Sequence, residues 1–328
     1  DKTLLELTDE ELDKALQLVK EEAGVLYPTV TGMLLLGKED RIAELLPIFK
    51  LFPSLGNDMR KKMYMLRRCI KVLQTKPTEH LAGITIQGDY KDFYELVESI
   101  YRITGLDDDQ TEIYYGVKNR LLGICYDIRH AFMGDRDIVL VGNGMHENIM
   151  KRHEQITPAQ NVYYSVEVLF PEAVFVAASV PKMYIFSSAF YGAKGKRTDM
   201  DEQLPPIPYS NYIRDKANLD VLCAGIWQAL GEAIGDEELE KLIQLMQRAD
   251  ESFIYYATQY IDKCNIELLK TAVEKRKDKL RNIAKRIVKK PQAYMNMEAE
   301  LRYWAKEYKT TIYELHDPKV EYPDDFEW

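Results

Sequence analysis

The segment that constrains the fold most is residues 113–136, where apolar side chains recur with the period of an α-helix. Its apolar positions are Ile113, Val117, Leu121, Ile124, Ile128 and Ala131. Steps of three and four residues place these side chains on one face, which is predicted to be buried. Gly134 is placed to end the helix in a left-handed conformation. A strand-like run, residues 138–142, follows it.

The same helix carries a polar stripe, formed by Arg120, Gly123, Asp127 and His130. As a catalytic pair, Asp127 would orient the His130 imidazole and raise its basicity. Arg120, Arg129 and Arg136 would then bind an anion. Alternatively, Asp127 and the arginines neutralise one another where the helix meets the sheet. Buried charges need partners for structural reasons alone, which favours the second interpretation.

The amino-acid composition limits the classes of protein to which the chain can belong. The 328 residues are 46% hydrophobic and 30% charged, typical of a soluble globular protein. The formal net charge of −9 argues against nonspecific nucleic-acid binding by the chain as a whole. The four cysteines form no CxxC pair, which fits a reducing cytoplasm. No continuous apolar run is long enough to span a bilayer, so no membrane association is expected.

No cofactor and no metal site is expected from the motifs. The segment at residues 144–153 has His146 and His153, but the H-E-x-x-H zinc signature would need histidine at position 150, where this chain has Met150. Tyrosine outnumbers phenylalanine by 22 to 10. Tyrosine is frequent at interfaces, so a homo-oligomer with a structural role is one open alternative.

A basic helix is predicted near the C-terminal end, within residues 270–290. Ten Lys and Arg residues stand there against two acids, Glu274 and Asp278. Its apolar positions are Val273, Leu280, Ile283, Ala284 and Ile287. The expected nucleic-acid-binding residues are Lys275, Arg276, Lys279, Lys285 and Arg286. An acidic protein partner, or the chain's own acidic surface, could bind this helix instead, and the acidic tail at residues 316–328 could fold back onto it.

The predicted class is α+β: a small mixed sheet packed with helices, followed by a mostly helical C-terminal region. Three parts are expected. Residues 1–58 form a short helical N-terminal segment, residues 63–212 the α+β core, and residues 213–328 the helical region. Pro53, Gly56 and Asn57, near the end of the first part, mark the boundary.

Two stretches resemble known families. The sequences ELTDEEL (residues 6–12) and YPTVTGMLLLGKEDRI (residues 27–42) resemble the closing part of Schlafen-type, AlbA-like DNA-binding domains, over about residues 4–47. From about residue 65 to the end, the GDY triplet at 88–90 and YDIRHA..GDR at 126–136 resemble a bacterial family of unknown function. The first resemblance implies an association with nucleic acid, and the second implies no mechanism.

The leading hypothesis from the sequence is a cytoplasmic binding or regulatory protein, associated with nucleic acid through the basic helix. DNA and RNA are not distinguished. The alternatives are a hydrolase or transferase that uses Asp127 and His130 on a phosphate-bearing substrate, and a structural subunit of an oligomer.

Overall fold

The computed structural model describes residues 19–22, 25–28, 73–105, 114–143, 145, 158–192, 206–248, 258–315 and 320–328. The chain forms two compact units, residues 1–71 and 72–328. In the first unit, β1 (Val19–Glu22) pairs antiparallel with β2 (Val25–Pro28). Helix was expected for residues 19–22, and pairing with a neighbouring strand overrides that local pattern. The rest of the predicted N-terminal helical segment lies outside the described residues.

The second unit contains a four-stranded sheet of order β3-β4-β6-β5. Its strands are β3 (Gln74–Pro77), β4 (Gly83–Gly88), β5 (Asp137–Gly142) and β6 (Gln160–Leu169). All three pairings are antiparallel, where the sequence had suggested a mixed sheet. β3 and β5 are therefore the two edge strands of this sheet.

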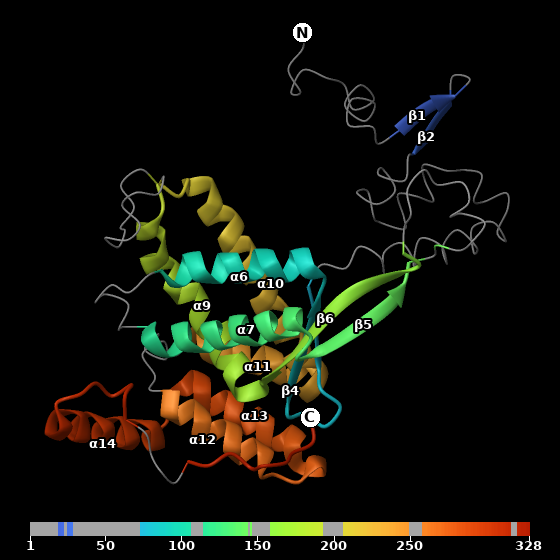
Figure 1. Cartoon of the computed structure of the whole chain (residues 1–328). Helices are drawn as coiled ribbons and strands as arrows, with labels where there is room; N and C mark the ends of the chain where they lie inside the picture. Colours follow the sequence, from blue (N-terminus) through green and yellow to red (C-terminus); the bar gives the residue numbers. More distant parts are fainter. Residues whose placement is uncertain are drawn as a thin grey trace. The chain divides into compact units, whose positions relative to one another are not determined.

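Helices make up most of the rest of this unit (Figure 1). They are α6 (Tyr90–Thr104), α7 (Tyr115–Met133), α9 (Phe170–Ser187), α10 (Tyr209–Ile234), α11 (Asp236–Arg248), α12 (Thr258–Leu269), α13 (Val273–Lys289) and α14 (Gln292–Tyr308), with a short 3-10 helix, η2 (Ser188–Phe190). The α+β class with a helical C-terminal region is confirmed.

The apolar stripe of α7 is buried as its spacing predicts. Val117, Leu121 and Ile128 are inaccessible to solvent and join a core that also includes Ile84 and Ile86 of β4. Gly134 ends the helix with a φ of 88°, a left-handed conformation that glycine adopts without strain. This termination directs the chain into β5.

Helix α9 lies in the core and packs against α10, α12 and α13. The segment Phe170–Phe190 is long and apolar enough to cross a membrane, and it is the one such segment in the described part of the chain. Because 61% of its apolar stretch is buried inside the unit, its hydrophobicity is accounted for by packing.

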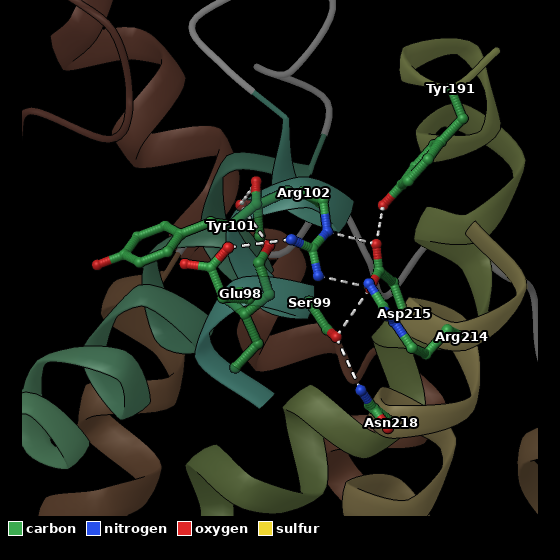
Figure 2. A network of polar contacts seen from close by, with 10 residues as sticks. Glu98, Ser99, Tyr101, Arg102, Tyr191, Arg214, Asp215 and Asn218 are labelled. Atoms are coloured by element: carbon green, nitrogen blue, oxygen red, sulfur yellow. Dashed lines mark hydrogen bonds and ion pairs between the residues drawn. The ribbon is translucent and has the colours of Figure 1, made fainter. Parts of the chain in front are cut away.

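A buried ion pair joins α6 to α10. The fully buried carboxylate of Asp215 accepts two hydrogen bonds from Arg102, at 2.7 and 2.8 Å. Ser99 and Tyr191 also donate to it, each at 3.0 Å. Figure 2 shows these donors converging on the one carboxylate. The pKa of Arg102 is raised, chiefly by its hydrogen bond to Asp215.

Candidate functional site: an acidic cavity beside α7

A cavity of about 530 Å³ lies between α7, the β5–β6 strands, the start of α9 and the C-terminal segment. Five carboxylates line it: Asp127, Asp135, Asp137, Glu167 and Glu172. Arg136 is the single basic residue in the lining, and Phe326 and Trp328 supply aromatic surface. The lining is therefore strongly acidic, with an apolar part.

Three of the five carboxylates have cationic or imidazole partners. Arg136 donates to Asp127 at 2.7 Å. Nδ1 of His130 lies 3.1 Å from the Asp135 carboxylate. Arg120 donates to Glu172 at 3.1 Å. These partners neutralise one side of the cavity.

Arg120 is itself held by a wider network behind the cavity. It also donates to the Asp262 carboxylate at 2.8 Å and to the Thr258 carbonyl at 3.2 Å. Tyr322, from the C-terminal segment, donates to Asp262 at 2.7 Å. Burial alone would lower the pKa of Arg120, but the charges of Glu172 and Asp262 more than offset this and raise it. Arg120 is therefore a structural group whose charge is already paired with two carboxylates.

The other two carboxylates, Asp137 and Glu167, make no hydrogen bond or ion pair within the described residues. Asp137 of β5 lies opposite Ser165 of β6, so Glu167 is its diagonal neighbour on the same face of the sheet. The pKa of Glu167 is raised, first by burial and then by the charge of Asp137. Two like charges thus stand side by side, one of them partly buried, and no described side chain pairs with either of them.

The catalytic pair predicted from the sequence does not form. Asp127 bonds to Arg136, and the partner of His130 is Asp135, because the left-handed turn at Gly134 brings Asp135 back toward the helix end. The His130 ring also lies 4.2 Å from the ring of Tyr126, measured between centroids. The orientation of His130 by Asp127 was therefore a wrong expectation.

The predicted anion site is not assembled either. Arg120 and Arg136 are both engaged by carboxylates. Arg129 is exposed and does not line the cavity. An anionic ligand would have to approach five carboxylates, and Coulomb repulsion opposes that.

Four of the five nucleic-acid-binding residues predicted on α13 form contacts with other parts of the protein. Arg276 is only 3% exposed and donates to backbone carbonyl groups. Lys279 and Arg286 both bond to Glu267 of α12, and Lys285 bonds to Glu238 of α11 at 2.9 Å. Of the five, Lys275 is exposed and has no described partner. The buried apolar face of α13 is confirmed by Leu280, Ile283, Ala284 and Ile287, which are inaccessible to solvent.

We expect the full chain to show no saturable binding to nucleic acid at about 0.15 M salt, because intramolecular pairing leaves few cations to displace phosphate counter-ions. Fluorescence anisotropy of labelled single-stranded DNA, duplex DNA and RNA, repeated at about 0.05 M salt, measures this. Salt-sensitive binding that disappears in a Lys275→Glu variant would contradict the expectation and restore α13 as a nucleic-acid surface.

No sequence motif singles out Glu167, Asp137 or Trp328 as site residues. A signal for Glu167 was present: it is the one charged residue in the strand sequence VYYSVEVLF, residues 162–170. Trp328 reaches the cavity through a long-range contact, since its carbonyl accepts a hydrogen bond from the His80 amide at 2.6 Å. No three His, Cys, Asp or Glu side chains of the described residues group to hold a metal ion. The His146–His153 segment lies outside the described residues.

A family model for a domain of unknown function matches residues 73–328, which include the whole cavity. No curated protein and no solved structure matches the chain.

Proposed function

We propose that this chain, which belongs to the family Domain of unknown function (DUF6904) through residues 73–328, is a binding protein that takes a small organic cation in the acidic cavity. The observation that carries the proposal is the unpartnered pair Asp137 and Glu167. Burying a carboxylate beside a like charge costs folding free energy, and charged groups inside proteins are normally paired. Asp137 is exposed and Glu167 is half-buried, so this cost falls on Glu167, and a carboxylate with a raised pKa in a cavity supports a binding site.

The residues that line the cavity also indicate what kind of cation would fit. Phe326 and Trp328 offer aromatic faces, and Ile124, Val168 and Leu169 add aliphatic surface. A ligand with an ammonium group and a short apolar body would satisfy both parts: the ammonium would face Glu167 and Asp137, and the body would contact the aromatic rings. The volume of about 530 Å³ falls in the range of small-molecule sites.

A phosphate-bearing substrate fits the cavity less well. The enzyme hypothesis needed arginines free to hold an anion, and both Arg120 and Arg136 are committed to carboxylates. His130 is not part of the lining. We therefore propose binding of a cation in preference to hydrolysis or transfer of a phosphate ester.

Phenethylamine is a suitable first probe, with 2-phenylethanol and phenylacetate as neutral and anionic analogues of the same body. By ligand-efficiency arguments its dissociation constant should be on the order of a millimolar. The Glu167→Gln variant is expected to weaken binding about tenfold, the effect of losing one charge-assisted hydrogen bond. Isothermal titration calorimetry of the full chain measures both values.

The matched control is Glu95→Gln, which removes a carboxylate from the exposed face of α6 and should leave phenethylamine binding unchanged. Equal binding of phenethylamine and 2-phenylethanol would contradict the proposal, because the carboxylates would then have no role. Preferential binding of phenylacetate would overturn it.

The same variant has a second expected effect, on stability. A carboxyl group whose pKa is raised in the folded state destabilises the fold above that pKa, and the penalty disappears in acid below its usual value of 4.5. Glu167→Gln should therefore raise the melting temperature at pH 7 slightly, by roughly 1–2 °C, with no gain at about pH 4. A loss of binding together with a gain of stability would separate a ligand-binding role of Glu167 from a structural one.

A further inference from the structure

The two edge strands of the sheet are protected to different degrees. The edge strand β3 carries Lys76 and Pro77 and packs against α10, where the Thr75 side chain fills the space at Gly225. Charged residues and proline on an edge are the usual means of preventing further strand pairing. β5, with the sequence DIVLVG, carries neither lysine nor proline.

β5 also exposes apolar side chains. Ile138 is 49% exposed and Leu140 is 56% exposed. Across the β5–β6 pairing, Leu140 lies opposite Val162, which is 44% exposed. This surface is continuous with the core, because Tyr164, opposite Ile138, packs edge-on against Phe132 of α7. Figure 1 shows β5 on the outer side of β6, and no described strand pairs with its other edge.

We infer that β5 pairs antiparallel with β5 of a second copy of this chain and joins the two sheets into one of eight strands. The occupant of such an edge must be an extended backbone, because the unpaired N–H and C=O groups need a ladder. A second copy supplies a strand of equal length whose one charged residue, Asp137, lies at its end, and a two-fold axis makes the contact closed and self-complementary.

The two-fold axis fixes the register. The axis is perpendicular to the sheet, and paired residues must lie on the same face of the sheet. One residue of β5 must therefore pair with its own copy. An axis at Val139 places Val139 opposite its own copy and Ile138 opposite Leu140 of the second copy. Both exposed apolar residues of each strand are then covered by their counterparts.

Charge does not oppose this register. Asp137 falls opposite Val141 of the second copy, so the two Asp137 residues are offset by four positions along the strand. At roughly 3.4 Å per residue this separates them by more than about 10 Å, the screening length at ordinary ionic strength. The like charges at the strand ends therefore contribute little.

Sedimentation velocity of the full chain over a range of concentrations tests the association. A contact of one strand pair is at the small end of specific interfaces, so a dimer with a dissociation constant in roughly the micromolar range is expected. Leu140→Lys, at an exposed position that tolerates lysine, should give a monomer throughout. The matched control Ile213→Lys replaces an exposed apolar residue of α10 and should still dimerise. A monomeric wild type, or a Leu140→Lys variant that dimerises as the wild type does, would overturn the inference.

Cross-linking tests the register separately. In this pairing, Val139→Cys would stand opposite its own copy at a distance that suits a disulfide, whereas Val141→Cys would not. Mild oxidation should give a covalent dimer for Val139→Cys and not for Val141→Cys or for the wild type, whose described cysteines, Cys125, Cys223 and Cys264, are buried. Equal cross-linking of the two variants would contradict the register.

Discussion

Replacing Arg102 by methionine is expected to destabilise the unit at residues 72–328 by about 3–5 kcal/mol, the cost of leaving a buried charge without its partner. Asp215 has no exposure to solvent, and Arg102 supplies two of its hydrogen bonds. Ser99 and Tyr191 would remain as neutral donors, and Arg214, whose Nε lies 4.0 Å from the carboxylate, would offset the charge only in part. The buried carboxylate would then need water to enter the core and hydrate it.

Urea denaturation followed by circular dichroism measures the change in unfolding free energy. Adding Asp215→Asn to Arg102→Met should restore part of the stability, since the unpaired charge is then removed, and a double-mutant cycle gives the coupling. Arg302→Met is the matched control: Arg302 pairs with Glu298 one turn away on α14 and is largely exposed, so a cost below about 0.5 kcal/mol is expected. A cost below about 1 kcal/mol for Arg102→Met would show that the ion pair is replaceable.

Local patterns predicted several elements of this fold. The apolar period of α7 and its glycine stop are visible in a window of about twenty residues. The contacts at the start of α6 are equally local: the Asp89 carboxylate accepts from the Asp92 N–H, and the Asp92 carboxylate accepts from the Asp89 N–H. In each case the groups that interact are separated by a few residues, and a sequence window contains both partners.

Short sequence windows could not predict the candidate site, because many of its contacts join residues that are far apart in the chain. Arg120 is 52 residues from Glu172 and 142 residues from Asp262. The basic character of α13 was visible, but Glu238 and Glu267, which neutralise it, come from other helices. Asp137 and Glu167 become neighbours only through the register of β5 on β6. A single sequence shows which residues are charged, but it does not show which residues pair with them.

Arg276 is the clearest example, and its loss should also cost about 3–5 kcal/mol. Its guanidinium donates to the carbonyls of His80 at 2.9 Å, Glu327 at 2.5 Å and Thr271 at 3.2 Å. It thereby joins the turn between β3 and β4, the C-terminal segment and the region that follows α12, where carbonyl groups lack helical partners. The acidic tail does fold back onto α13, through this backbone contact.

Arg276→Met should therefore lower the urea midpoint and loosen the segment that carries Phe326 and Trp328 into the cavity. Arg276→Lys should restore little of the lost stability. The three carbonyl groups are spaced to bind the nitrogen atoms of a guanidinium group, and a single ammonium group cannot reach all of them. The neighbouring Lys275→Met, at an exposed position, should change the unfolding free energy by less than about 0.5 kcal/mol.

Hydrogen exchange of residues 320–328 measures the second effect of Arg276→Met. Faster exchange there, together with weaker phenethylamine binding under conditions where the variant is folded, would place Arg276 behind the cavity wall as a positioning residue. It would also separate Arg276 from Glu167, because Glu167→Gln should weaken binding without lowering stability. Unchanged exchange and stability in Arg276→Met would mean that the C-terminal segment is held by other contacts, such as the Tyr322 hydrogen bond to Asp262.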